Sequence, residues 1–354
     1  MHPHKEIVHG GDVLSAMEKT GRSSLLDFSA NVNPLGLPES VRHAVIQGLE
    51  QSTSYPDPLC RSLRCALSQY EGVPHPYILC AGGANDLIFR LAYALRPKLA
   101  LLLAPTFAEY ELALTQANCR CIHHMLREED AFLPRPSLVQ EAENCDLVLL
   151  CNPNNPTGAL IDPALMEQVL DTCIRTGAVL AVDECFLDFL PNEEEHTLKK
   201  KLEHYNKLII LRAFTKIFAI PGLRLGYALS SGTELLRKMD QAGPSWNVSV
   251  PAQLAGVAAI KETAYLQKTR CLIATERAWL QEALSALGLK VYPGAANYLF
   301  LRCQDRSLSE KLMEQGVLIR DCSNYRGLEP GYFRVAVRNR MENTALVRAM
   351  KECL

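Results

Sequence analysis

The segment RAFTKIFAIPGLRLGY places Lys216 among apolar residues and Arg224 eight residues later. A lysine in such surroundings loses hydration, and it then becomes nucleophilic enough to form a Schiff base with a carbonyl compound. The alternative is a lysine whose stem covers the surface while its ammonium group reaches water. The segment alone leaves both interpretations open.

Two further polar residues follow apolar runs. Asn155 lies in the turn CNPNNPTG after DLVLL, where turn chemistry alone could explain it. Asp183 ends the run AVLAVD, and a carboxylate at the end of a buried strand is costly unless it is paired. Asp183 is therefore expected either to cap the local backbone or to face a cation. Glu184 points the other way and is expected to be structural.

Taken together, these residues match the requirements of pyridoxal 5'-phosphate. Lys216 would hold the aldehyde, and Asp183 would keep the ring nitrogen protonated so that the ring accepts electrons. Asn155 would bind the phenolate oxygen, and Arg224 would bind the phosphate. The four roles occur in one chain, so the sequence predicts a pyridoxal-phosphate site with Lys216 as its catalytic residue.

The elements that must position these residues alternate between strand and helix from about residue 78 to 230. Continuous apolar runs such as LALLLA and KLIILRAF are typical of a mainly parallel sheet covered on both faces. Helices are expected at 85–95, 109–117 and 162–176, and a long one at about 251–287. We predict an N-terminal arm at 1–40 joined to the small domain, a large domain at 41–245 and a small α+β domain at 246–354.

Composition excludes several classes of protein. The net charge is -2, which gives no electrostatic reason to expect a nucleic-acid or membrane partner. No stretch approaches the roughly 18 consecutive apolar residues of a membrane span, and the first residues lack the apolar core of a signal peptide. The thirteen cysteines form no CxxC pair, which favours reduced thiols in a cytoplasmic protein without a metal site. The run EEEHTLKKKLEH is expected to be a solvated helix face.

Over nearly its whole length the chain resembles the fold-type I pyridoxal-phosphate enzymes of the aspartate aminotransferase superfamily. The resemblance implies an α/β fold with a mainly parallel seven-stranded sheet and a smaller α+β C-terminal domain. It also implies a homodimer, because SYPDP matches the segment whose tyrosine, here Tyr55, reaches the cofactor of the neighbouring subunit. AGGAND matches the phosphate turn, where the N–H groups of Ala84 and Asn85 would bind the phosphate. PTFAEY places Phe107 against the cofactor ring.

Within the superfamily two groups are similar to this chain. Histidinol-phosphate aminotransferases share YPDP, NPNNPTG and GLR. Threonine-phosphate decarboxylases share longer motifs, among them LLDFSANVNPLGLP, DECFLDF, FAIPGLRLGY and LIRDCSNYRGL. Phe186 stands where the aminotransferases carry a tyrosine that binds the phenolate oxygen. Two positions depart from the decarboxylase pattern: AGGAND replaces its usual turn, and Ala213 replaces a serine that contacts the phosphate, for which Thr215 is expected to compensate.

The resemblance implies decarboxylation of O-phospho-L-threonine to (R)-1-aminopropan-2-yl phosphate for the cobalamin nucleotide loop. The alternatives are a histidinol-phosphate aminotransferase and a decarboxylase that prefers O-phospho-L-serine. His9 can also be explained as a solvated histidine of the arm, and Arg334 and Arg338 as arginines on the surface. Asn297 is explained equally well as a pocket residue or as a buried turn amide. The expected substrate-binding residues are His9, Asn33, Asn155, Arg320, Arg334 and Arg338.

Overall fold

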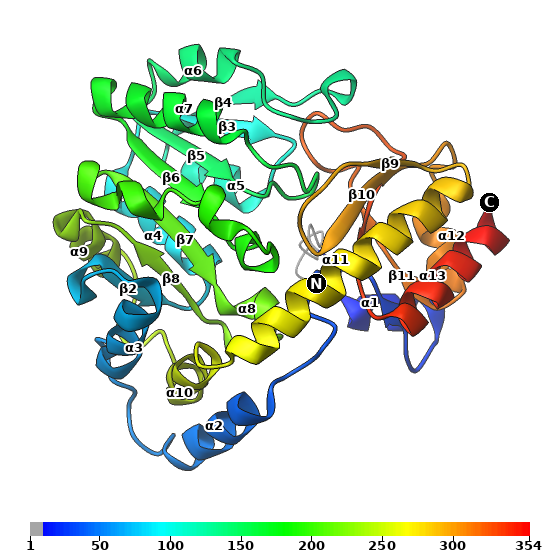
Figure 1. The fold of residues 1–354 in the computed structure, drawn as a ribbon, viewed down its shortest axis with the longest axis horizontal. Helices are drawn as coiled ribbons and strands as arrows, with labels where there is room; N and C mark the ends of the chain where they lie inside the picture. Colours follow the sequence, from blue (N-terminus) through cyan, green and yellow to red (C-terminus); the bar gives the residue numbers. More distant parts are fainter. Residues whose placement is uncertain (1–9) are drawn as a thin grey trace, which may run out of the picture.

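The structure is a computed structural model that describes residues 10–354, so His9 lies outside the described residues. In this part of the chain, a large domain is built on a seven-stranded sheet and a small domain on a four-stranded sheet (Figure 1). The large sheet has the order β2-β8-β7-β6-β5-β3-β4, in which β8 runs antiparallel to both of its neighbours and the other pairs are parallel. This confirms the predicted fold class. The strands are β2 (Ile78–Ala81), β3 (Leu99–Ala104), β4 (Arg120–Met125), β5 (Leu147–Cys151), β6 (Val179–Asp183), β7 (Leu208–Ala213) and β8 (Gly226–Leu229).

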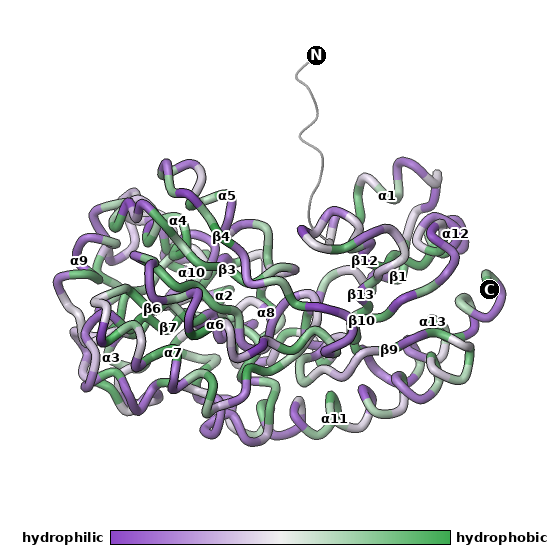
Figure 2. The backbone as a smooth tube through the Cα atoms, turned by 90° about the horizontal axis from the view of Figure 1, so that it is seen from above, coloured by the Kyte–Doolittle hydropathy of each residue, from purple (hydrophilic) through white to green (hydrophobic). Residues whose placement is uncertain are grey.

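The central strands are apolar throughout because both faces of the sheet are covered. Leu102 and Leu149 belong to one buried cluster with residues of α4, α5 and α9. Their neighbours Leu101 and Val148 belong to a second cluster with residues of α3, α6, α7 and α10. Alternate side chains of a strand point to opposite faces, so each face buries its own half of the run. Figure 2 shows the hydrophobic colour gathered in the interior of the large domain.

Helices connect the strands of the large domain. The predicted helix at 162–176 is present as α7, and the Asp162 side chain caps it by accepting hydrogen bonds from the N–H groups of Ala164 and Leu165. The large-domain helices are α2 (Glu39–Glu50), α3 (Arg61–Glu71), α4 (Ala84–Leu95), α5 (Glu109–Gln116), α6 (Ser137–Ala142), α7 (Pro163–Thr176), α8 (Phe214–Ile217) and α9 (Thr233–Gln241).

The small domain is an antiparallel sheet of order β12-β13-β10-β9 with helices beside it. The arm contributes to it, because β1 (Leu26–Asp27) pairs in parallel with β11 (Val317–Leu318). The remaining elements are α1 (Val13–Thr20), β9 (Lys290–Tyr292), β10 (Tyr298–Arg302), α12 (Leu308–Glu314), β12 (Arg320–Asp321), β13 (Tyr332–Ala336) and α13 (Arg340–Cys353).

The long helix expected at 251–287 is two helices, α10 (Val250–Ala259) and α11 (Thr263–Ala286). α10 packs against α2 and α3 of the large domain, although it follows the boundary expected at residue 245. Its approach to α2 is close: a Cβ on Gly48 would lie 2.5 Å from the Cα of Pro251. α11 then runs from the large domain to α13 in the small domain (Figure 1). The chain must change direction between these two packing surfaces, which apolar periodicity does not reveal.

The charged run EEEHTLKKKLEH is not a solvated helix face. It forms two short 3-10 turns, Glu193–Glu195 and Lys199–His204. Glu193 and Lys199 turn inward and form ion pairs with other residues of the large domain. The expectation was wrong because those partners are distant in sequence. None of the helices within residues 10–354 is both long and apolar enough to cross a membrane.

Candidate active site

A pocket of about 210 Å³ lies where β5, β6 and β7 end, at the edge where open α/β sheets bind ligands. The large domain supplies most of its walls, and Arg334 and Tyr325 of the small domain close it. The pocket brings together many of the residues singled out from the sequence, namely Ala84, Asn85, Phe107, Asn155, Asp183, Phe186, Ala213, Thr215, Lys216, Arg224 and Arg334.

Lys216 lies in α8, the single helical turn that follows β7. Burial is the main cause that lowers the pKa of its ammonium group from 10.5 to about 8, and the positive charges of Arg334 and Arg224 add to the effect. A large fraction of Lys216 is therefore a neutral amine at mildly alkaline pH. This is the form that attacks an aldehyde.

Asp183 ends β6 and is buried. Its carboxylate accepts one hydrogen bond from the hydroxyl group of Tyr110 at 2.7 Å and another from the N–H group of Cys185 at 2.9 Å. Both donors are neutral. A buried carboxylate held by neutral donors is suited to a cationic ligand group such as a protonated ring nitrogen. Glu184, the next residue, points to the opposite side and pairs with Arg212 at 2.8 Å, which confirms the structural role expected for it.

Asn155 and Arg334 meet across the two domains. Arg334 lies on β13 and donates from Nη1 to Oδ1 of Asn155 and from Nη2 to the carbonyl oxygen of Ser29 at 2.7 Å. Its guanidinium carbon lies 5.4 Å from the ring centre of Tyr298. Arg334 is buried and both of these acceptors are neutral. Its Nε is also buried and has no hydrogen-bond partner among residues 10–354. The cation is therefore suited to an anionic ligand.

The glycine-rich turn ends at the N-terminus of α4, beside Arg224. Gly83 has φ of 97°, a conformation that favours glycine, and it lets α4 begin at Ala84. A Cβ on Gly83 would lie 3.0 Å from Nη2 of Arg224, so the guanidinium group sits directly against the turn. A helix N-terminus and an arginine side by side form a site for a phosphate group. Buried Thr215 lines the same pocket.

Three predicted substrate residues lie outside this pocket. Asn33 donates to the carbonyl oxygen of Ile217 and to Oγ1 of Thr269, both at 2.7 Å, so its amide hydrogens hold the chain behind Lys216. Arg338 pairs with Glu342 at 2.7 Å. Neither side chain lines the pocket, and their roles as substrate ligands stay predictions.

Arg320 is the third residue outside the pocket. It lines a neighbouring cavity that shares Gly10 and Ser29 with the pocket. It is buried, and its Nη2 donates to Oδ1 of Asn324 at 2.7 Å. Asn297 is a buried turn amide whose Nδ2 donates to the carbonyl oxygen of Asn31 at 3.1 Å.

Tyr55 also lies outside the pocket. It is 81% exposed, and its ring centre lies 5.2 Å from that of Trp246. It lines a separate surface hollow with Gln253 and other residues of α10.

Several pocket residues were missed from the sequence. Tyr110 ends the quoted motif PTFAEY and lies in the first turn of α5, where its ring meets that of Phe107 edge to face with centres 5.5 Å apart. Cys151 is the last residue of β5, and Cys185 lies two residues after the end of β6. Tyr325 lies in LIRDCSNYRGL, but nothing in that motif indicates that it faces the pocket.

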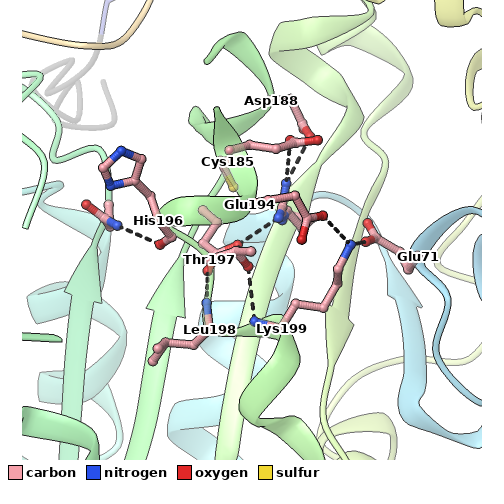
Figure 3. A network of polar contacts seen from close by, with 12 residues as sticks. Glu71, Cys185, Asp188, Glu194, His196, Thr197, Leu198 and Lys199 are labelled. Carbon is pink, nitrogen blue, oxygen red and sulfur yellow. Dashed lines mark hydrogen bonds and ion pairs between the residues drawn. The ribbon is translucent and has the colours of Figure 1, made fainter. Parts of the chain in front are cut away.

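A network of ion pairs joins residues of β7, of α3 and of the segment that follows β6 (Figure 3). Arg212 of β7 pairs with Glu184 at 2.8 Å and with Asp188 at 2.9 Å. Lys199 pairs with Glu71 at 3.1 Å and with Glu194 at 3.4 Å, as Figure 3 shows. Burial raises the pKa of Asp188 to about 7, and the charge of Arg212 opposes that rise. The network therefore fixes the chain next to Asp183, the last residue of β6, and before Lys216, which follows β7.

Comparison with known proteins identifies the family of the chain. Residues 23–350 match the family model described as aminotransferase class I and II. The chain is 39% identical to the threonine-phosphate decarboxylase of Salmonella typhimurium, over 98% of this chain and 96% of that protein. It is 32% identical to histidinol-phosphate aminotransferase 1 of Cupriavidus pinatubonensis, over 94% of this chain and 89% of that protein. The solved structure of the histidinol-phosphate aminotransferase from Clostridium acetobutylicum has a TM-score of 0.85 at 27% identity, covering 92% of this chain and 98% of that one.

Proposed function

The chain belongs to the class I and II aminotransferase family, and we propose that it is a pyridoxal-phosphate-dependent decarboxylase of O-phospho-L-threonine. The product would be (R)-1-aminopropan-2-yl phosphate, the linker of the cobalamin nucleotide loop. One observation carries the proposal: a pocket with nucleophilic Lys216, buried Asp183 and buried Arg334 occurs in a chain whose similarity to a decarboxylase of this substrate spans nearly its full length. The thirteen free cysteines fit a reducing, cytoplasmic setting.

The residues of the pocket fit pyridoxal 5'-phosphate. Lys216 would hold the aldehyde carbon through its amine, and Asp183 would face the ring nitrogen. The N-terminus of α4 and Arg224 would bind the phosphate group. Phe107 would pack on the ring, and Asn155 would donate to the phenolate oxygen. When bound, the cofactor supplies an electron sink for the bond that breaks at the substrate's Cα.

The pocket would have to hold the substrate so that the bond from Cα to the carboxylate is the one that the cofactor's electron sink weakens. Loss of the carboxylate as CO₂ would leave Cα in need of one proton. Lys216 is the group that would donate it, since a pKa of about 8 allows the amine to gain and lose a proton near neutral pH.

The substrate phosphate sets this orientation, because it fixes the far end of the molecule. We assign it to the side of Arg320, whose cavity adjoins the pocket at Gly10 and Ser29. Arg334 would hold the carboxylate end of the substrate before reaction. Phe186, buried in the pocket wall against Tyr298 with ring centres 5.0 Å apart, offers no hydroxyl group to the phenolate oxygen. His9 remains a predicted phosphate ligand.

The functional unit that we propose is a homodimer. Tyr55 is too exposed for a residue that acts within its own subunit, and it lies beside exposed Trp246. A second copy packed on this surface could bring Tyr55 to the neighbouring phosphate site. Light scattering should give the mass of two chains, and Tyr55→Phe should weaken cofactor binding without changing that mass. A monomer with full activity would contradict the dimer.

One assay tests the function. Purified protein loaded with pyridoxal phosphate should release CO₂ from O-phospho-L-threonine in the absence of any 2-oxo acid. The same preparation should form no glutamate from histidinol phosphate and 2-oxoglutarate, and a run with O-phospho-L-serine would give the preference between the two phosphorylated amino acids. Lys216→Ala provides the inactive control. Glutamate formation without CO₂ release would show an aminotransferase instead.

A further inference from the structure

A loop of the small domain, Cys322–Gly327, forms one wall of the pocket, and we refer to it as the Tyr325 loop. It is part of the connection from β12 to β13, and Tyr325 within it is buried and lines the pocket. The guanidinium carbon of Arg320 lies 5.2 Å from the ring centre of Tyr325. Tyr325 therefore contacts both the pocket and the arginine to which we assign the substrate phosphate.

The next residue, Arg326, ties this loop to the large domain. Its Nε donates to one carboxylate oxygen of Glu111 at 3.1 Å, and its Nη2 donates to the other at 2.7 Å. Two parallel hydrogen bonds of this kind fix orientation as well as distance. Glu111 lies on α5 directly after Tyr110, the residue that binds Asp183. The pair thus joins the two opposite walls of the pocket.

A second contact beside Arg326 fixes the same loop. Gly327 has φ of 83°, and a Cβ there would lie 2.6 Å from Cε of Met125 and 3.8 Å from the carbonyl oxygen of Ala104. These are residues at the ends of β4 and β3. The loop is therefore held against the large domain by the ion pair of Arg326 and, at the next residue, by contact between Gly327 and the end of the Met125 side chain.

The Glu111–Arg326 pair itself contributes little to global stability. The Arg326 side chain is 55% exposed and that of Glu111 is 35% exposed, and ion pairs in such positions are weak in water. The position of the pair is specific nevertheless. It connects the two domains directly beside Tyr325, the aromatic residue of the loop that lines the pocket.

We propose that Glu111 and Arg326 are positioning residues that hold Tyr325 against the pocket and thereby set the affinity for the phosphorylated substrate. This rests on the proposed function. Neither residue touches the pocket's reacting groups; both act through Tyr325. When the pair is broken, the loop gains freedom, and the wall next to Arg320 is no longer fixed before the substrate binds.

The test uses Arg326→Gln, Glu111→Gln and the charge-swapped double variant Glu111→Arg/Arg326→Glu. Each single variant should raise KM for O-phospho-L-threonine about fivefold with kcat and cofactor affinity nearly unchanged, which is the pattern for loss of ground-state positioning. The double variant restores an ion pair and should recover most of the wild-type KM. Arg237→Gln, which breaks the exposed pair with Glu234 on α9, is the matched control and should leave KM unchanged.

Amide hydrogen exchange gives a readout that does not depend on the substrate. Peptides covering 322–328 should exchange faster in both single variants, while peptides of β6 and β7 stay as in the wild type. Faster exchange in an enzyme without activity toward phosphothreonine would reject the proposed function and keep the positioning role. Unchanged exchange in the Tyr325 loop, or a KM that the charge swap fails to recover, would overturn the inference.

Discussion

At the scale of single residues, the pocket combines a lysine with a lowered pKa and two buried ions, Asp183 and Arg334, that have no ion-pair partner within residues 10–354. Burial and the positive charges of two arginines lower the pKa of Lys216 and so favour its neutral form. Asp183 and Arg334 are held by neutral hydrogen-bond partners. Such a site is prepared for a ligand that brings both a cationic ring and anionic groups.

The lowered pKa of Lys216 gives a pH-dependent prediction. The folded chain binds fewer protons than the unfolded chain between pH 8 and 10.5, so this residue makes the free energy of unfolding rise with pH over that interval. Capture of pyridoxal phosphate by the apoenzyme should likewise accelerate as Lys216 loses its proton, with a midpoint at pH about 8. Stopped-flow absorbance measures the rate. A midpoint near 10.5 would mean that Lys216 behaves like a lysine in water.

Site residues that belong to a motif with a fixed spacing could be predicted from the sequence. Residues that reach the pocket only through tertiary packing could not. Lys216 and Arg224 were recognisable because the motif fixes their separation, and both line the pocket. Tyr110 and Tyr325 reach the pocket only after α5 and the Tyr325 loop pack. Asn33 was expected to contact substrate, but its amide is used by Ile217 and Thr269, which is a tertiary contact without a local signal.

At the scale of elements, the ends of β6 and β7 position Asp183 and Lys216. The ion pairs of Arg212 in turn hold these strand ends in place. Arg212 is nearly inaccessible and faces two buried carboxylates, Glu184 and Asp188. Removal of one member of such a network leaves the others charged and without compensation.

Arg212→Met should therefore lower the free energy of unfolding by about 3–5 kcal/mol. Urea denaturation of the apoenzyme measures the change. Addition of Glu184→Gln to that variant should recover part of the loss, because it removes one of the unpaired charges. The matched control is Arg237→Met on the surface of α9, where the loss should stay below about 1 kcal/mol. Equal losses for the two arginines would refute the structural role of the network.

Strands were the elements best predicted from the sequence, because a run buried on both faces must be apolar along its whole length. The break between α10 and α11 was not predicted. Each helix has an apolar face, and the two helices differ only in the elements against which that face packs. The run EEEHTLKKKLEH was misjudged for a related reason: Glu193 and Lys199 find buried partners from other elements.

At the scale of the whole molecule, the segment 128–132, which follows β4, holds the two domains together. Glu128 accepts hydrogen bonds from Lys290 and Arg302, both at 2.7 Å, and from the hydroxyl groups of Tyr292 at 2.6 Å and Tyr332 at 2.7 Å. All four donors belong to the small-domain sheet. This contact holds β13, and with it Arg334, in place over the large domain.

Phe132, four residues after Glu128, strengthens the same contact. Its ring meets those of Tyr292, Phe300 and Tyr332 edge to face, with centres 5.0, 5.2 and 5.8 Å apart. Buried aromatic contacts of this geometry add stability beyond the area that they bury. The segment therefore fastens the domains by both charge and packing.

The hydrogen bonds to Glu128, together with the charge of Arg302, outweigh its partial burial and lower its pKa from 4.5 to about 2. Its contribution to stability is therefore complete above pH 4.5 and is lost as the pH falls through about 2. At pH 7, Glu128→Gln should lower the free energy of unfolding by about 1–3 kcal/mol, and the difference from wild type should shrink as the pH approaches 2. The neighbouring exposed Glu129→Gln is the control. An effect of the same size at every pH would contradict the role of the charge.

The measurement that tests the account most directly is reduction of the loaded enzyme with borohydride, followed by proteolysis and peptide mapping. Reduction makes the bond between cofactor and amine permanent, so the label marks the residue that holds the aldehyde. The account predicts one label per chain, on Lys216. A label on any other lysine, or a protein that carries none after loading, would contradict it.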